Sequence, residues 1–269
     1  MASLRKDPMS STDPKTLRIA ALNLRQGGAP RAAAIAAALN ALGPDVVVLS
    51  EAYPTGGRQR VLDFLAADGL VHQATADADS IRVASAVAIA SRKPLADVHQ
   101  PITGSNRQRV LEARVDDVLI TGVYFPLGKP KVAFWRDEFL PYATSRLQTG
   151  GVLIGDWNSG SHYVDEASAT LFGAVEFEAM TTMGWTDAWR SLHPDGREFT
   201  WYSRPWWNGF RLDHAFLAPS LKARLRDARY EHGTRPHGAG VAVSVSDHSA
   251  TIVDLTQARP QSLGVRRGT

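Results

Sequence analysis

The chain has 269 residues, of which 44% are hydrophobic, so it can bury a core large enough for one α/β domain or for two small ones. Its 30 Lys and Arg residues and 27 Asp and Glu residues leave a net charge of +3, and the pI of about 9.3 permits a polyanionic partner without requiring one. The absence of cysteine excludes disulfides, a thiolate nucleophile and Cys-ligated zinc, so any metal ion must bind oxygen or imidazole.

The two ends of the chain differ in composition from the part between them. Residues 1–16 are polar and lack the apolar segment of a signal peptide, and residues 258–269 form a basic tail with little apolar surface to bury. No apolar run approaches the roughly 20 residues that a membrane-spanning helix needs. We therefore expect disordered segments at residues 1–16 and 258–269 and a single domain over residues 17–257. We also expect a soluble, cytoplasmic protein with no membrane attachment and no evident protein partner.

Between the two ends, short apolar runs alternate with helical patterns. The run Val-Val-Val-Leu at residues 46–49 is apolar on both faces, which is typical of a strand covered by other layers. In chain order we predict a strand at residues 17–22, a helix at 29–42, a strand at 45–50, a helix at 58–67, strands at 83–90, 110–115 and 118–125, a helix at 131–146, a strand at 152–154, a mostly helical segment at 166–183, and strands at 199–202, 212–217 and 249–253. This order predicts a four-layered α/β sandwich, in which two packed mixed β-sheets are flanked by helices.

Polar residues follow the predicted strands at six places, where a layered scaffold presents side chains to a common cleft. They are Asn23, Glu51, Tyr124, the pair Asp156 and Asn158, Asp213, and the pair Asp247 and His248. Each alone has an ordinary explanation, because a carboxylate can cap a helix or pair with a surface Arg, Gly-Asp-Trp-Asn can be a plain Asx turn, and an isolated histidine is more often structural. Their order along the chain is the stronger signal.

That order of residues resembles the endonuclease/exonuclease/phosphatase family, of the exonuclease III and deoxyribonuclease I type. The resemblance extends from residue 17 to residue 253, and segments 184–190 and 193–201 support it. Its most specific parts are Gly-Asp-Trp-Asn at residues 155–158, Arg-Leu-Asp-His at 211–214 and Ser-Asp-His at 246–248. The resemblance implies a metal-dependent enzyme that hydrolyses phosphodiesters.

Hydrolysis of a phosphodiester, a stable anion, requires an activated water and neutralisation of the charge that grows on the phosphoryl oxygens. A hard divalent ion supplies much of this, and Glu51 is the best candidate ligand because Mg²⁺ prefers carboxylate oxygen. The resemblance implies Mg²⁺ or Mn²⁺ as the cofactor, and it adds Asn23 and Asp247 to the metal-binding residues.

The resemblance also implies roles for the remaining strand-end residues. Asp156 matches the residue that orients or deprotonates the attacking water, and Asn158 matches a neutral donor to the nucleophile or to a phosphoryl oxygen. His248 would contact the scissile phosphate, and Asp213 would hold its ring and raise its affinity for a proton. Tyr124 matches a tyrosine that contacts the phosphate, although a tyrosine before Phe-Pro can equally be a packing residue.

Four residues are predicted to bind the substrate. Asn208 matches the family's asparagine near the phosphate, and Arg25 occupies a position where members that act at abasic sites carry an acidic residue. Arg25 therefore either points at a phosphate or is a solvated surface charge. Trp201 and Arg211 belong to a cluster that suits stacking on an unpaired base, or that closes the core at the end of a sheet. The other members of this cluster are Arg204, Trp206 and Trp207.

Further basic residues leave alternatives open. Lys129, Lys131 and Arg136 follow the predicted hairpin and either extend a phosphate track or form the solvated face of a helix. His162 either assists a second metal or the substrate, or is a hydrogen-bonded loop residue. The segment after Asn158 lacks the basic loop of the abasic-site enzymes, which puts abasic specificity in doubt.

The hypotheses for function follow from these residues. The first is a Mg²⁺- or Mn²⁺-dependent nuclease with DNA as its partner, cutting internally or from an end. The second is a phosphatase or phosphodiesterase with the same core that acts on a small phosphoester such as an inositol phosphate, a lipid head group or a nucleotide, because loops at the rim choose the substrate. The third, a nucleic-acid-binding module without activity, would require a lost ligand, and every core position carries a chemically competent residue.

Overall fold

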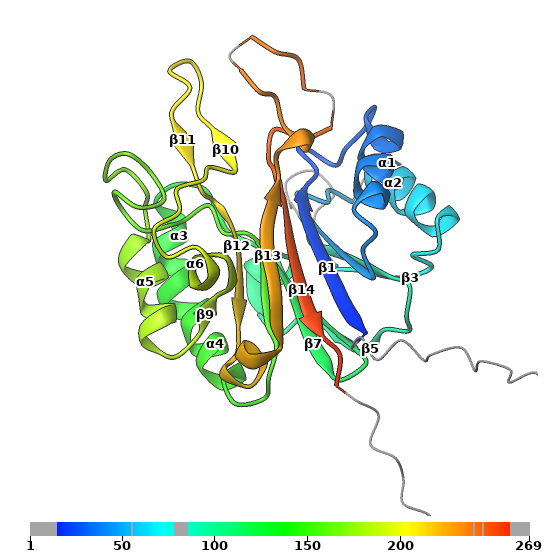
Figure 1. Cartoon of the computed structure of the whole chain (residues 1–269), viewed down its shortest axis with the longest axis horizontal. Coiled ribbons are helices and arrows are strands. Elements are labelled where there is room, and N and C mark those ends of the chain that lie inside the picture. The colour runs from blue at the N-terminus through cyan, green and yellow to red at the C-terminus, as the bar shows by residue number, and fades with distance from the viewer. Residues whose placement is uncertain (1–14, 55, 78–85, 239, 244, 259–269) are drawn as a thin grey trace, which may run out of the picture.

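The structure, a computed structural model, describes residues 15–258 except residues 55, 78–85, 239 and 244 (Figure 1). Two six-stranded sheets face each other in the middle of the described chain, and helices cover the outer side of each. Both sheets are mixed, since each holds one parallel pair of strands among antiparallel ones. The predicted four-layered α/β sandwich is therefore confirmed.

The first sheet brings the two ends of the described chain together. Its first strand in sequence pairs in parallel with the second and antiparallel with the last. In spatial order the strands are β13 (Leu225–Glu231), β14 (Ala250–Thr256), β1 (Thr16–Asn23), β2 (Val46–Ser50), β4 (Ala88–Ser91) and β3 (His72–Thr75). Thr16 thus lies in a strand, while the rest of the predicted disordered segments, apart from Lys15 and Ala258, falls outside the described residues.

The second sheet carries the hairpin predicted around Asp116 and Asp117. In spatial order its strands are β5 (Ala96–His99), β6 (Val110–Val115), β7 (Val118–Tyr124), β8 (Val152–Asp156), β12 (Asp213–Leu217) and β9 (Thr186–Asp187). A separate small hairpin, formed by β10 (Trp201–Tyr202) and β11 (Gly209–Phe210), stands beyond the end of this sheet (Figure 1).

The helices fall into two groups that cover opposite faces of the sandwich (Figure 1). One group consists of α1 (Ala32–Ala41) and α2 (Gly56–Ala67). The other consists of α3 (Pro130–Ala133), a π-helical stretch at Phe134–Phe139, α4 (Leu140–Arg146), α5 (Ala174–Thr182) and α6 (Ala188–Leu192). No helix of the described part of the chain is long and apolar enough to cross a membrane.

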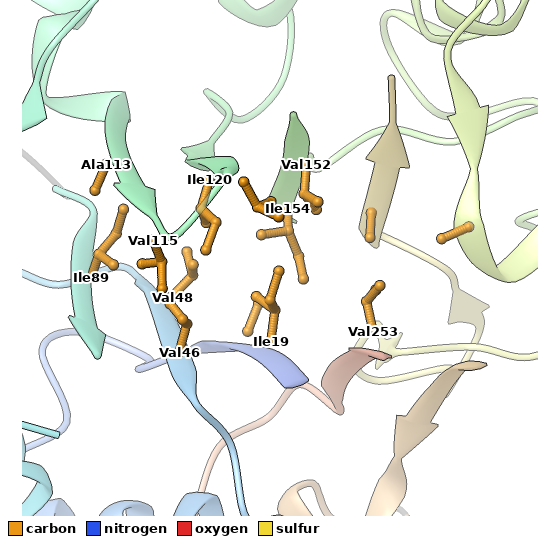
Figure 2. Packing of buried hydrophobic residues seen from close by; sticks show 14 of the residues in the cluster. Ile19, Val46, Val48, Ile89, Ala113, Val115, Ile120, Val152, Ile154 and Val253 are labelled. Carbon is orange, nitrogen blue, oxygen red and sulfur yellow. The ribbon is translucent and has the colours of Figure 1, made fainter. Parts of the chain in front are cut away.

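Three apolar clusters join these layers. Between the sheets, side chains such as Ile19, Val48 and Ile89 pack against Ile120 and Ile154 (Figure 2). A second cluster packs α1 and α2 on the first sheet, and a third, rich in aromatic rings, packs the π-helical stretch, α4 and α5 on the second, whereas the buried residues of α6 belong to the first cluster. Burying one such aliphatic side chain contributes about 1.5–3 kcal/mol. The strand ends are therefore held on a rigid support.

Two predicted elements need correction or limitation. The segment predicted as mostly helical at residues 166–183 is helical only over Ala174–Thr182, because the buried carboxylate of Glu166 accepts hydrogen bonds from the backbone N–H groups of Thr170 and Leu171 and holds a loop there. Of the strand predicted at 83–90, residues 83–85 lie outside the described residues, and β4 begins at Ala88.

Candidate active site

The predicted strand-end residues converge because of the register of the strands. β1 and β2 run in parallel and end together, with Asn23 opposite Ser50, one residue before Glu51. In the other sheet, Tyr124 at the end of β7 lies opposite Asp156 of β8. Asp156 in turn lies opposite Asp213 of the antiparallel strand β12. The two sheets thus deliver carboxylates to one end of the sandwich.

Asp213 and His248 form a buried pair. The Asp213 Oδ2 and His248 Nδ1 atoms are 2.8 Å apart, and both side chains are almost fully excluded from water. Burial alone would lower the pKa of His248, but the negative charges of Asp213 and Asp156 outweigh it and raise this pKa to about 10. The ring is therefore a cation at neutral pH, with Nδ1–H donating to Asp213 and Nε2 left for other partners.

Asp156 lies beside this pair and is held on both oxygens. Its Oδ1 accepts a hydrogen bond from the backbone N–H of Asn158 at 2.9 Å, and its Oδ2 accepts one from Asn23 Nδ2 at 2.8 Å. Burial raises the pKa of Asp156 to about 7, with His248 opposing this shift and Asp213 adding to it. A carboxylate with this proton affinity is suited to accept a proton near neutral pH.

The backbone before Asp156 can be formed only by glycine. Gly155 has φ of +147°, and a Cβ atom there would lie 2.2 Å from the carbonyl oxygen of Val123 on the neighbouring strand. Asn158 follows with φ of +48°, a conformation that asparagine tolerates better than most residues. The Gly-Asp-Trp-Asn motif therefore fixes where β8 ends and how Asp156 is presented.

Glu51 is presented by a similar backbone conformation, with φ of +48°. Its carboxylate accepts the backbone N–H of Gln26 at 2.7 Å and the Tyr124 hydroxyl at 3.3 Å. Tyr124 is thus a buried residue whose hydroxyl reaches the site, so the packing and functional interpretations both describe it.

A hollow of about 350 Å³, called here the central hollow, opens above these residues. Its polar lining includes Glu51, Lys131, Asp156, Asp247 and His248. One side of it is apolar and comes from rim segments that the sequence did not connect with the site. The apolar residues are Leu127, Leu171, Phe172, Phe210 and Leu212.

Lys131, for which the sequence left both a phosphate track and a solvated helix face open, lines the central hollow. The side chain is 3% exposed, and Nζ donates a hydrogen bond to the backbone carbonyl of Asn158. Burial lowers the pKa of Lys131 to about 8, although Asp156 counteracts this. The predicted solvated helix face is wrong for Lys131, whereas Lys129 is exposed and Arg136 pairs with Glu176.

The oxygen donors fit a hard divalent ion. Glu51, Asp156 and Asp247 all line the central hollow, and their carboxylates are the ligand type that Mg²⁺ and Mn²⁺ prefer. One ligand atom from each of Asp156, Asp213 and His248 also lies within 4.8 Å of the others. Because Asp213 and His248 bind each other, Glu51 and Asp247 are the better candidates. Asn23 faces Asp156 and the Arg25 backbone N–H, so its metal role stays a prediction.

The predicted substrate-binding residues separate into different places. Arg25 and Trp201 lie at the rim of the site, where Trp201 lines the central hollow with its ring centroid 6.3 Å from that of His248. The Arg25 Nε is 3.8 Å from the Asp247 carboxylate. Asn208 lies exposed in the turn between β10 and β11 and does not line the hollow, so the structure does not bring it to the phosphate position.

Arg211 is a correction. We predicted a substrate-binding arginine, but its side chain is 1% exposed and its guanidinium binds Asp165 at 2.7 Å and Asp187 at 2.8 Å. It also stacks over the ring of Trp189, so it has no free face for a ligand. His162 is a hydrogen-bonded loop residue, with Nε2 at 2.9 Å from the carbonyl oxygen of Leu171.

A two-sheet sandwich that gathers an Asp–His pair and further carboxylates at its strand ends defines a class of hydrolases that act on phosphoesters. The model of the endonuclease/exonuclease/phosphatase family matches residues 20–248, and the chain belongs to this family. Its members hydrolyse phosphoester bonds and generally depend on a divalent metal ion. The comparison with curated proteins finds no match.

Solved structures share the fold at low sequence identity. An AP endonuclease from Archaeoglobus fulgidus superposes with a TM-score of 0.73 and 19% identity, over 88% of this chain and 98% of that one. A 3′–5′ exonuclease from Neisseria meningitidis gives 0.72 and 22%, over 90% and 100%. A 3′ phosphatase from Neisseria bound to a product DNA hairpin gives 0.70 and 22%, again over 90% and 100%.

Proposed function

We propose that the protein is a divalent-metal-dependent nuclease that hydrolyses phosphodiester bonds of DNA. The observation that carries this proposal is the buried Asp213–His248 pair, 2.8 Å apart, which shares one hollow with Asp156 and Glu51. This hollow combines a fixed cation for the phosphate with a carboxylate for the water, and hydrolysis of a phosphodiester requires both.

The side chains of the site have different roles in the proposed reaction. Asp156 accepts the proton of the attacking water, and Asn23 and the Asn158 backbone hold its oxygens in place. His248, kept charged by Asp213, donates from Nε2 to a phosphoryl oxygen, where negative charge grows in the transition state. The Asn158 amide donates to the Phe125 carbonyl oxygen at 3.0 Å and the Tyr124 hydroxyl donates to Glu51 at 3.3 Å, so both side chains help to hold the site in place.

A bound divalent ion would be held by Glu51 and Asp247, which line the central hollow. It would supply a Lewis acid that neutralises charge on the phosphoryl group. Lys131 adds a positive charge close to Asp156 and the Asn158 carbonyl. The balance of charge in the hollow is therefore suited to an anionic ester that carries a metal ion.

DNA is favoured over small substrates by the charge and the rings around the site. Arginines and tryptophans at the rim suit a polyanion with stacking bases, and the pI of about 9.3 is compatible with that partner. The similar structures also bear on this choice, because their descriptions name an AP endonuclease, a 3′–5′ exonuclease and a complex with a DNA hairpin.

A second candidate is a phosphatase or phosphodiesterase that acts on a small phosphoester. The apolar side of the central hollow favours it, because Leu171, Phe172 and Phe210 could cover the non-phosphate part of a small molecule. One of the similar structures is described as a 3′ phosphatase, but its bound product is a DNA hairpin, so that structure favours a phosphatase acting on DNA rather than on a small molecule.

The test measures cleavage of labelled single-stranded DNA, duplex DNA and duplex DNA with an abasic site, in parallel with phosphate release from inositol phosphates and nucleotides. Each is incubated with Mg²⁺, Mn²⁺ or a chelator, and with the parent protein or the Glu51→Gln and His248→Ala variants. We expect metal-dependent DNA cleavage that both variants lose. Phosphate release from a small molecule with intact DNA would replace the proposal by the second candidate, and equal activity of parent and variants would refute the site.

A further inference from the structure

A second hollow, called here the rim hollow, adjoins the central hollow and has a volume of about 360 Å³. The two hollows share Trp201 and Asp247 as a common wall. Residues of the β10–β11 hairpin and its turn line the rim hollow, together with Arg235, Pro236 and Asp247, which lie between β13 and β14, and with Arg25. A ligand that extends from the central hollow past Trp201 therefore enters the rim hollow directly.

Aromatic rings line the hairpin side. Tyr202 and Trp207 stack on each other, with ring centroids 5.0 Å apart and an angle of 15° between their planes. Trp207 has φ of +58°, an uncommon conformation for a bulky residue, and such strain tends to occur where a residue serves a ligand. Tyr202 is therefore contacted by Trp207 and by the Arg235 guanidinium, and it supports Trp207, which together with Trp201 offers aromatic surface to the rim hollow.

The rim hollow is also positively charged. Arg25, Arg204 and Arg235 line it, and among the described lining residues Asp247 is the one carboxylate. Arg235 is fixed, since its Nε donates to Ser249 Oγ at 2.9 Å and its two terminal nitrogens donate to the carbonyl oxygens of Pro236 at 3.2 Å and Phe199 at 3.3 Å. Arg235 therefore adds positive charge to the wall, but each of its guanidinium nitrogens already donates to the protein. Arg204 is exposed and can turn toward a ligand. The wall thus combines excess guanidinium with stacked aromatic rings.

We propose that the rim hollow binds an unpaired nucleotide next to the scissile phosphate, with the base against Trp207 and the adjoining phosphate on Arg25 and Arg204. The proposal rests on the proposed nuclease function and names its substrate class, namely DNA that is single-stranded or has unpaired nucleotides at the cut. A paired base offers only its edges in a groove, whereas an unpaired base offers a face on which aromatic side chains stack. Guanidinium groups bind phosphate in a fork geometry that suits the backbone.

The chain offers a matched pair of tryptophans for the test. Trp207 lines the rim hollow, whereas its neighbour Trp206 is 81% exposed and does not. Binding of a fluorescent oligothymidylate is measured by anisotropy in chelator, and cleavage of single-stranded and blunt duplex DNA is measured with Mg²⁺. We expect Trp207→Ala to weaken oligonucleotide binding about tenfold, Arg204→Gln to weaken it less, and Trp206→Ala to leave it unchanged.

The controls separate the subsite from folding and from the chemistry. Trp207→Phe keeps a stacking ring and should restore most of the binding. If Trp207 were merely structural, the weaker binding of Trp207→Ala would be accompanied by a lower melting temperature. Cleavage of bis(p-nitrophenyl) phosphate, which reaches only the central hollow, should stay within about twofold of the parent value in all four variants. Equal binding by Trp207→Ala and Trp206→Ala, in a protein that cuts DNA, would overturn the inference alone. A parent protein that cuts no DNA would instead overturn the proposed function.

Discussion

Two clusters of buried charge lie on either side of the start of β12, and they differ in what surrounds them. In one, Arg211 is enclosed by Asp165 and Asp187 and has no free face. In the other, His248 is held by Asp213 but opens, together with Asp156, into the central hollow. Arg211 and Asp213 are separated by a single residue, so one short stretch of chain supplies both a structural and a functional cluster.

The pKa values of the carboxyl groups differ in direction between the clusters. Burial would raise the pKa of Asp187 and Asp165, but the permanent charge of Arg211 outweighs it and lowers both. Burial raises the pKa of Asp156 to about 7, because its cationic neighbour His248 is shared with Asp213. A dedicated arginine therefore makes a buried carboxylate inert, and a shared histidine leaves it able to exchange a proton.

The largest effect is expected when the cluster of His248, Asp213 and Asp156, called here the open cluster, is disrupted by substitution. His248→Ala should lower kcat by about 10³- to 10⁴-fold, because the donor to the phosphoryl oxygen is lost. Asp213→Asn should cause a loss of kcat of similar size. Because Asp213 and Asp156 also lose their shared buried cation, the free energy of unfolding should fall as well, and kcat is compared at a temperature where the variant is folded. Steady-state kinetics and urea unfolding measure both quantities. Wild-type kcat in either variant would contradict the assignment.

Disrupting the cluster of Arg211, Asp165 and Asp187, called here the closed cluster, should lower stability strongly and change kcat little. Arg211→Met leaves two buried carboxylates without their cation, which typically costs about 3–5 kcal/mol of stability. At a temperature where the variant is still folded, its kcat should stay within about tenfold of the parent value, since Arg211 contacts no substrate. Urea unfolding followed by tryptophan fluorescence measures the loss. An unchanged midpoint would show that Arg211 is not structural.

Acid unfolding should sharpen the comparison further. The pKa of Asp187 is lower in the folded protein than in the unfolded chain, so its contribution is complete above about pH 3.9 and is lost as the pH falls below that value. Between pH 5 and pH 2.5 this loss amounts to about 2 kcal/mol for one carboxyl group. Asp187→Asn should lose less stability than the parent over this range. Parallel curves for the two proteins would contradict the pKa direction.

The smallest effect is expected at the edge of the open cluster. Lys131→Met removes the donor to the Asn158 carbonyl and the positive charge near Asp156, and we expect kcat to fall about tenfold. Lys129→Met, two positions away on the exposed start of α3, should keep the parent kcat. If both variants behave alike, Lys131 serves only packing.

The sequence predicted the polar residues at the strand ends better than the loop residues that surround the hollows. Asn23, Asp156 and Asp213 lie at the ends of buried strands and Glu51 and His248 lie next to such ends, so strand register accounts for most of their convergence at one end of the sandwich. The rim depends on loop conformations that leave no periodic pattern, so Phe172 and Arg235 could not be placed in advance.

Burial of charge also escaped prediction. Lys131 and Arg211 belong to residue types that are usually exposed, and only the fold shows the groups that enclose them. The edge strands β5 and β13 were missed for a related reason, since charged side chains on an edge strand obscure its alternation of apolar and polar residues.

The pairing of β1 with β14 has a consequence for the newly made protein. Ser246 Oγ donates to the carbonyl oxygen of Asn23 across 223 positions of sequence, immediately before the residues that complete the Asp–His pair. At about 5–20 residues per second, a ribosome needs roughly 10 to 45 s to travel that distance. During this time the nascent chain carries Asn23 and Glu51 but no His248. On the proposed function, the newly made chain gains activity only after β14 has paired with β1 and His248 has reached the site.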